Sequence, residues 1–283
     1  MRIVTTIAET RAAVRELRAA GRSVGLVPTM GALHAGHLSL VRAAKAQCDA
    51  VVVSIFVNPT QFGPNEDFAK YPRTWDEDCA LLRDDGVDLL FAPSAEEMYP
   101  AGASTFVDVE GVSDRLDGVS RPGHFRGVST VVAKLFHIVG PDKAFFGQKD
   151  AAQVAVLRRM VRDLHFGLEL VVCPTVREAD GLAMSSRNRY LSSVERRQAL
   201  VLSKALRRVK ERVAQGVFEV ATLIDEALAV LASESDVRVD YCKIVNPETL
   251  EDLPDVRKGA LVAIAAVVGR TRLIDNAVIS PPK

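Results

Sequence analysis

Val27-Pro28-Thr29-Met30-Gly31-Ala32-Leu33-His34-Ala35-Gly36-His37-Leu38 is the stretch of sequence that decides the fold. An apolar run ends at Pro28, a glycine-containing turn follows, and a helical pattern begins near Leu38. The N-terminus of a helix attracts anions, because its unpaired N–H groups and its dipole both point outward. With two histidines flanking Gly36, the stretch predicts a phosphate-binding turn. The alternative is an ordinary strand-to-helix turn with two surface histidines.

Strand and helix patterns alternate on both sides of this turn. We expect strands over Val24–Val27, Ala50–Val57, Val87–Phe91, Lys143–Phe146 and Leu168–Cys173. We expect helices over Leu38–Gln47, Trp75–Arg83, Gly127–Val139 and Ala151–Leu164. Such alternation with short loops predicts an α/β fold, a Rossmann-like doubly wound parallel sheet. Ligands bind such sheets at the carboxyl ends of the strands, beside the point where the strand order reverses.

The pattern changes after Pro174. A capping box, Ser192 to Glu195, precedes a long helix to about Val213, and a second helix covers Val220–Leu231. Strands are expected over Val237–Val245, Ala260–Val268 and Leu273–Ile279. We therefore predict a Rossmann-like nucleotide-binding domain over residues 1–175 and a smaller α+β C-terminal lid domain over 176–283. Pro281 to Lys283 are expected to form a frayed tail.

Composition excludes several classes of function. The 283 residues carry 36 basic and 36 acidic side chains, which leaves no electrostatic footprint for nucleic acid or an anionic membrane. No run of about eighteen apolar residues is present, and the N-terminus lacks the apolar core of a signal peptide. The four cysteines are widely spaced, with no C-x-x-C, which indicates buried thiols and a reducing cytoplasm.

Polar groups lie at or near the ends of other predicted strands. Asn58 and Gln61 offer donors and acceptors that suit a substrate with hydroxyl and carboxylate groups. The alternative is that Asn58 caps a turn and Gln61 is solvated. In a second glycine-containing turn, Gly147–Asp150, Lys149 offers a cation and Asp150 a helix cap or a ribose contact. Gln153 falls on the first turn of the helix that follows.

Three loops complete this inventory. Ala183–Asn188 offers two hydroxyls and a guanidinium that can hold a polyphosphate, or it is a serine-rich linker. Arg121–Gly127 offers two arginines for a carboxylate or phosphate, or it is a capped helix start. The polar insertion Gly63–Arg73 is either a mobile lid or a passive surface loop.

None of these motifs supplies a clear protein nucleophile. The serines lack G-x-S-x-G context, and neither a Walker A motif nor G-x-G-x-x-G is present. This favours direct attack of a substrate oxyanion on a nucleotide phosphate, which requires positioning and charge stabilisation more than base catalysis.

His34-Ala35-Gly36-His37 together with Met184-Ser185-Ser186-Arg187 resembles the paired signatures of the adenylating nucleotidyltransferase superfamily, which includes class I aminoacyl-tRNA synthetases. The blocks Val27–His37, Phe56–Gly63, Arg121–Gly127 and Phe146–Asp150 narrow the resemblance to the pantoate–β-alanine ligase (pantothenate synthetase) family. The resemblance covers nearly the whole chain and is looser after about residue 200.

The resemblance implies an ATP-dependent ligase that forms a C–N bond. Pantoate would attack ATP to give pantoyl adenylate and diphosphate, and β-alanine would then displace AMP. The implied catalytic residues are His37 as proton donor, His34, Lys149 and Arg187. The implied ATP contacts are Met30, Gly31, Ala32, Leu33, His34, Ala35, Gly36, His37, Gly147, Gln148, Lys149, Asp150, Val176, Met184, Ser185, Ser186 and Arg187. The implied pantoate and β-alanine contacts are Gln61, Gln153, Asn58 and Arg121.

Mg²⁺ would bridge the phosphates, and its protein ligands stay unknown. Asp76-Glu77-Asp78 is a candidate support, with a solvated helix start as the alternative. Arg187 would replace the lysines of the class I synthetase signature.

The family also implies a homodimer through the C-terminal part of the Rossmann domain. Two other functions share parts of the pattern: a nucleotidyltransferase that leaves the nucleotide on its product, and a nucleotide-binding module without chemistry.

Overall fold

The computed structural model describes residues 1–64 and 66–280, and the expected tail Pro281–Lys283 lies outside this range. The chain divides into two compact units. The first unit holds residues 1–147 and 156–174, and the second holds 148–155 and the chain from 175 onward. The short segment 148–155 therefore groups with the C-terminal residues, although it lies within the first predicted domain.

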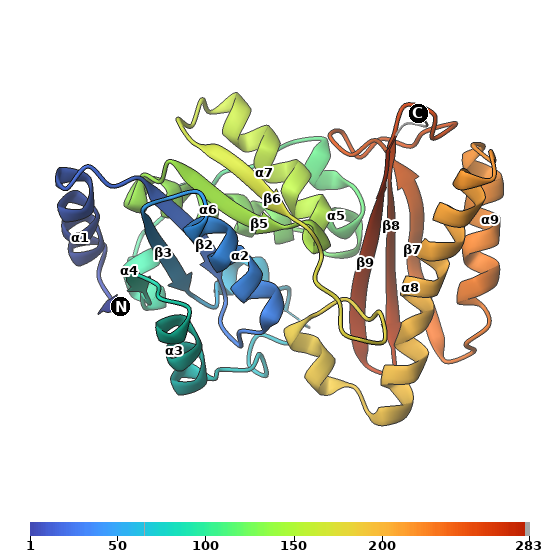
Figure 1. Ribbon diagram of the computed structural model, residues 1–283, viewed down its shortest axis with the longest axis horizontal. Helices are drawn as coiled ribbons and strands as arrows, with labels where there is room; N and C mark the ends of the chain where they lie inside the picture. The colour runs from blue at the N-terminus through green and yellow to red at the C-terminus, as the bar shows by residue number, and fades with distance from the viewer. Residues whose placement is uncertain (65, 281–283) are drawn as a thin grey trace. The chain divides into compact units, whose positions relative to one another are not determined.

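The first unit is built on a parallel six-stranded sheet in the order β1-β4-β3-β2-β5-β6. Figure 1 labels the four strands β3, β2, β5 and β6 of this sheet. Its strands are β1(Arg2–Val4), β2(Val24–Thr29), β3(Ala50–Ile55), β4(Leu89–Phe91), β5(Lys143–Gly147) and β6(Glu169–Cys173). Strand β2 has β3 on one side and β5 on the other. The strand order reverses between β2 and β5, and this confirms the predicted doubly wound sheet.

Helices pack on the sheet of the first unit. They are α1(Ile7–Ala19), α2(Ala35–Lys45), α3(Trp75–Asp84), α4(Ala95–Met98), α5(Asp117–Ser120), α6(His124–Val139) and the part of α7(Ala151–Asp163) from Val156 onward, with 3₁₀ turns η1(Pro59–Gln61) and η2(Val112–Asp114). Helix α2 contacts β2, β3 and β5, whereas α1 and α6 contact each other and β2. Alternate residues of the strands are buried with α2 and α3 in one cluster, as expected for side chains that point to opposite faces.

Strand β1, helix α1 and the short turns of helix α4, α5, η1 and η2 were not predicted. Strand β1 has only three residues, too few to show a periodic pattern. Helix α1 begins at a capping box in which Thr6 Oγ1 accepts from Glu9 N, and the Glu9 carboxylate accepts from Thr6 N. The Thr-x-x-Glu pattern of residues 6–9 is present in the sequence and indicates the start of this helix. Strand β3 ends at Ile55, two residues before the predicted end.

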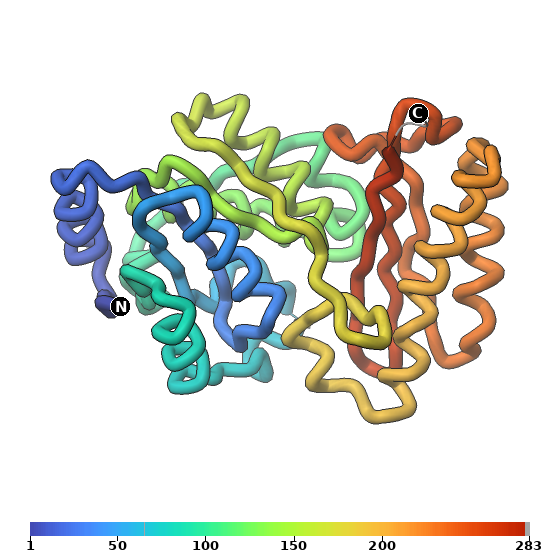
Figure 2. The backbone as a smooth tube through the Cα atoms, viewed as in Figure 1, coloured from blue at the N-terminus to red at the C-terminus, as the bar shows by residue number. Residues whose placement is uncertain are grey.

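The second unit is an antiparallel three-stranded sheet covered by two helices. Its elements are β7(Val237–Val245), β8(Ala260–Val268), β9(Thr271–Ile279), α8(Ser193–Ala214) and α9(Val220–Leu231), with 3₁₀ turns η3(Gln148–Asp150) and η4(Ser186–Tyr190). The three strands run side by side with β8 in the centre (Figure 2). The predicted Ser192–Glu195 capping box begins α8.

The core of the second unit joins these helices to the sheet. Helix α8 contacts β8 and β9, and α9 contacts α8 and β7. All but one residue of β8 are buried, which explains why this strand reads as an unbroken apolar run. Across the described residues, none of the helices is both long and apolar enough to cross a bilayer.

Candidate active site

The turn after β2 carries the first group of predicted ATP contacts. Met30 is partly buried, and Gly31 and Ala32 both adopt positive φ angles of 80° and 50°. At Gly31 a Cβ atom would lie 3.0 Å from the Asp78 carboxylate and 3.1 Å from Ile55. Glycine is therefore required at this position for both its conformation and its space.

Asp78 holds this turn in place. Its side chain is buried, with Oδ2 accepting from Ala32 N at 2.9 Å and Oδ1 accepting from Leu33 N at 2.8 Å. Thr74 Oγ1 donates to the same carboxylate at 3.1 Å. The sequence of the acidic run Asp76–Asp78 has two interpretations: a support for Mg²⁺, or a solvated start of a helix. Neither describes Asp78, because its carboxylate is buried and accepts hydrogen bonds from the protein. It is a structural acceptor for the turn.

His34 and His37 form a reciprocal capping box at the start of α2. His34 Nδ1 accepts from Gly36 N at 3.1 Å, and His37 Nδ1 accepts from His34 N at 3.3 Å. The two rings lie with their centroids 4.1 Å apart. A backbone N–H can only donate, so Nδ1 of each ring is unprotonated. Each ring therefore carries its proton on Nε2, the atom that can donate to a ligand.

Gln61 lies in the η1 turn after β3 and reaches toward the end of β2. Its Nε2 contacts Met30 Sδ at 3.1 Å, and its Oε1 accepts from Asn58 Nδ2 at 3.0 Å. The turn packs closely on α6, because a Cβ at Gly127 would lie only 2.3 Å from Thr60 O and 2.7 Å from Gln61 Cα. Gln61 is thus joined to the first predicted ATP turn.

Asn58 is almost fully buried, and its polar atoms are taken by protein partners. Nδ2 donates to Gln61 Oε1 and to Gly127 O, and Oδ1 accepts from Thr60 and from the Tyr99 hydroxyl at 2.9 Å. This arrangement matches the alternative in which Asn58 caps a turn. A direct contact between Asn58 and substrate stays a prediction.

Arg121 is likewise engaged within the protein. It makes a bidentate pair with Glu66 at 2.6 and 2.7 Å and contacts His124 Nε2 at 2.9 Å. His124 Nδ1 lies 2.8 Å from Gln61 O, which can only accept, so the ring proton is on Nδ1 and Nε2 accepts from Arg121. Burial, and then the charge of Arg121, lower the pKa of His124 from 6.5 to about 4. His124 is therefore neutral at pH 7.

The second unit carries the turn Gln148–Asp150. Lys149 Nζ lies 3.5 Å from Asp150 Oδ1, and both side chains are partly buried. The carbonyls of Gln148 and Lys149 accept from Asn276 Nδ2 on β9, at 2.9 and 2.8 Å. Gln153 is partly buried on the first turn of α7, as expected, and Gly147 ends β5 in the first unit.

The predicted loop Met184–Arg187 also belongs to the second unit. Val176 O accepts from Met184 N at 3.0 Å, which joins two predicted ATP contacts. Ser185 Oγ caps η4 by accepting from Arg187 N, and Ser186 is buried. Arg177 donates to Gly181 O within this loop and pairs with Asp275 at 2.7 and 2.8 Å. The segment is therefore a hydrogen-bonded loop that ends in the 3₁₀ turn η4.

The described residues do not form an evident metal site. Within residues 1–64 and 66–280, no group of three or more histidine, cysteine, aspartate or glutamate side chains is arranged to hold a metal ion. The acidic run begins helix α3, where Asp76 and Glu77 are exposed and Asp78 binds backbone N–H groups.

Sequence reasoning missed the residues that hold the predicted site residues in place. They are Asp78, Tyr99, Gly127, Arg177, Asp275 and Asn276. Polar residues within the apolar strand 271–279 were a usable signal, because buried polar groups need partners. Gly127 gave no local signal, because the close approach of η1 depends on tertiary packing.

Comparisons with known proteins place the chain in a family. The family model described as pantoate-beta-alanine ligase matches residues 2–278. A pantothenate synthetase from Acidobacterium capsulatum is 67% identical, covering 99% of this chain and 97% of that protein. One from Koribacter versatilis is 61% identical over 99% of this chain and 96% of its own length.

Two solved structures resemble the whole chain. The pantothenate synthetase of Thermus thermophilus is 51% identical, with a TM-score of 0.95, covering 99% of this chain and 100% of that one. The pantoate-beta-alanine ligase of Francisella tularensis, complexed with beta-gamma ATP and beta-alanine, is 34% identical with a TM-score of 0.81, covering 98% and 97%. With the reciprocal histidine cap at the end of β2, these matches show that the chain belongs to the pantoate–β-alanine ligase family.

Proposed function

We propose that the chain condenses pantoate with β-alanine to pantothenate, using ATP and releasing AMP and diphosphate. The observation that carries this proposal is the reciprocal cap of His34 and His37, which holds two Nε2–H donors at the N-terminus of α2. This terminus follows the carboxyl end of β2, where the strand order reverses. Such a place suits an anionic ligand whose charge grows during reaction.

The proposed reaction has two steps. A carboxylate oxygen of pantoate attacks the α-phosphorus of ATP, and the bond to the bridging α,β oxygen breaks to release diphosphate. The amine of β-alanine then attacks the acyl carbon, the C–O bond breaks, and AMP leaves with the carboxylate oxygen. The surplus ammonium protons pass to solvent. Because a carboxylate is ionised at pH 7, the first step needs donors and cations more than a base.

Residue roles follow from these needs. His37, as proton donor, and His34 donate from Nε2 to phosphate oxygens, and Lys149 and Arg187 supply positive charge. The other ATP contacts are Met30–Gly36, Gly147, Gln148, Asp150, Val176 and Met184–Ser186. Gln61 and Gln153 bind pantoate, with Gln61 also contacting β-alanine.

Asn58 and Arg121 act on Gln61 in this proposal. Asn58 holds the Gln61 side-chain oxygen, and Arg121 lies 3.4 Å from Gln61 O and fixes His124, which binds the same carbonyl at 2.8 Å. Both are therefore positioning residues for Gln61.

Mg²⁺ is proposed to arrive on the phosphates of ATP. No step above is assigned to a protein ligand of the ion.

Product analysis tests the proposed function. With ATP and pantoate alone, the account predicts diphosphate release limited to about one per active site, because the adenylate stays bound. Addition of β-alanine starts steady formation of AMP and pantothenate. ADP as the product would overturn the proposal. Diphosphate without free AMP would favour a nucleotidyltransferase, and substrate binding without turnover would favour a binding module.

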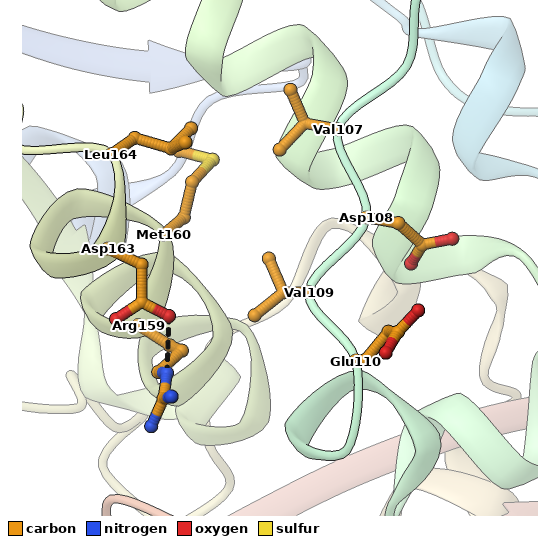
Figure 3. Close-up of a pocket in the computed structure, with 8 residues that line it drawn as sticks. All are labelled: Val107, Asp108, Val109, Glu110, Arg159, Met160, Asp163 and Leu164. Carbon is orange, nitrogen blue, oxygen red and sulfur yellow. Dashed lines mark hydrogen bonds and ion pairs between the residues drawn. The ribbon is translucent and has the colours of Figure 1, made fainter.

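We also propose a homodimer that uses the first unit. A pocket of about 320 Å³ lies between residues 107–110 and the last turns of α7. Val107, Val109, Met160 and Leu164 supply its apolar lining, while Asp108, Glu110 and the paired Arg159 and Asp163 carry the polar groups (Figure 3). Leu164 is 53% exposed and nearby Phe106 is 46% exposed, which is unusual for an uncovered face.

Sedimentation tests the dimer. The wild type should sediment as a dimer and Leu164→Asp as a monomer, and a monomeric wild type would contradict the proposal.

We place the protein in the cytoplasm, a location supported by its four free cysteines.

A further inference from the structure

Asn276 joins the last strand of the second unit to the turn that carries Lys149. Its side chain is 5% exposed and lies on β9, more than 120 residues beyond that turn. Nδ2 donates to Gln148 O at 2.9 Å and to Lys149 O at 2.8 Å, and Oδ1 accepts from Gln148 Nε2 at 3.2 Å. Carbonyl oxygens only accept, so the orientation of the amide is fixed by its partners.

The neighbouring residue Asp275 serves the other predicted ATP loop. Its carboxylate is 4% exposed, takes both terminal nitrogens of Arg177, and accepts from Asn276 N at 2.8 Å. Arg177 in turn donates to Gly181 O, in the loop that leads to Met184–Arg187. Adjacent residues of one strand therefore hold both groups of predicted ATP contacts in this unit.

The location of this polar pair is unusual. Asp275 and Asn276 pair in register with Ile264 and Ala263 of β8, in a sheet whose core is apolar. Burying an amide and a carboxylate in such a sheet is unfavourable unless both are fully hydrogen-bonded. In other proteins, replacing buried ion pairs by hydrophobic residues of similar volume is often neutral or stabilising. The hydrogen-bond partners of Asn276 indicate the role of its side chain. Within the described residues, its side-chain hydrogen bonds go to Gln148 and Lys149.

We propose that Asn276 is a positioning residue for Lys149 in the adenylation step, with Asp275 doing the same for the Met184–Arg187 loop through Arg177. The inference rests on the proposed function of Lys149 as the cation at the phosphates. A lysine side chain is long and flexible, so its reach depends on where its backbone is held. Asn276 fixes that backbone by binding the carbonyls of Lys149 and of the preceding residue.

Asn276→Asp tests this directly. The carboxylate has the same shape but cannot donate to the two carbonyls. We expect diphosphate release at saturating ATP and pantoate to fall on the order of 10–100-fold, because a small displacement of a catalytic group has effects of this size. The pantoate KM should change little. Asn246→Asp is the matched control, because Asn246 uses its side-chain oxygen as an acceptor in a turn of the same unit. The control should keep the wild-type rate.

A double-mutant cycle separates positioning from a general structural role. If Asn276 acts through Lys149, Asn276→Asp should have almost no further effect on the rate in a Lys149→Ala background. Additive losses would overturn the proposal, as would a wild-type rate in Asn276→Asp. Asn276→Ser, which keeps one donor, replaces the aspartate variant in the cycle if the latter does not fold. A wild type without pantoate-dependent diphosphate release would instead overturn the proposed function.

Discussion

His37 has two separable roles because its two ring nitrogens do different work. Nδ1 accepts the His34 N–H in the cap, and Nε2–H is proposed to donate to phosphate. Asparagine can place its oxygen near the Nδ1 position but has no group at Nε2. We therefore expect His37→Asn to keep near-native thermal stability and to slow diphosphate release ~10²–10³-fold, the usual loss of one transition-state donor. A near-wild-type rate would contradict the role of Nε2.

The second prediction at the scale of a single side chain concerns the Asp78 carboxylate and the use of ATP. In Asp78→Asn, one oxygen that accepts Ala32 N or Leu33 N becomes an NH₂ group, which cannot accept. Loss of one hydrogen bond to a charged acceptor costs about 1.5–3 kcal/mol, so we expect kcat/KM for ATP to fall by roughly 10–100-fold. The exposed neighbour Glu77 provides the control as Glu77→Gln. Equal kinetics for the two variants would show that the turn does not depend on Asp78.

At the scale of elements, η1 and α6 meet at Gly127 without room for a methyl group. Gly127→Ala places Cβ against backbone atoms of Thr60 and Gln61, so the turn must shift. We expect a loss of about 1–3 kcal/mol in the free energy of unfolding. The pantoate KM should rise on the order of 10-fold with the ATP KM nearly unchanged. Gly167→Ala, where the Cβ meets nothing within 4 Å, serves as the control. A raised ATP KM with an unchanged pantoate KM would contradict the assignment of Gln61.

Element-level prediction worked where periodicity is regular. Helix α9 and the strands β7 and β8 occur within the bounds that their apolar patterns predicted. The residues chosen as site candidates came from family motifs and from the rule for strand ends. The partners of their supports could not be found that way, because Asp78, Gly127 and Asn276 act through contacts between segments distant in sequence. A local pattern can mark Asn276 as a polar residue in an apolar strand, but it does not identify the turn that Asn276 contacts.

At the scale of the whole molecule, His124 makes stability depend on pH. Its pKa is about 4 in the folded protein and near 6.5 when unfolded, so the unfolded chain binds the proton first as pH falls. Stability should therefore decline between about pH 6.5 and pH 4, by up to about 3 kcal/mol from this group. The pKa of Glu66 is lowered, mainly by its hydrogen bond to Arg121 against an opposing burial effect, so its contribution is lost at still lower pH.

Denaturant unfolding of the wild type and of His124→Gln, from pH 7 to pH 4, measures this effect. Glutamine can donate to Gln61 O and accept from Arg121 without titrating, so the variant should lose less stability over this range. Parallel pH profiles for the two proteins would show that His124 is not the group responsible.

The central claim is that pantoate is activated as an acyl adenylate. Pantoate labelled with ¹⁸O in its carboxylate tests it most directly, in a reaction with ATP and β-alanine followed by mass spectrometry of the nucleotide. The account predicts one ¹⁸O atom in the phosphate of each AMP, because the carboxylate oxygen that attacks the α-phosphorus leaves with AMP. AMP without label, or label in inorganic phosphate alongside ADP, would contradict it.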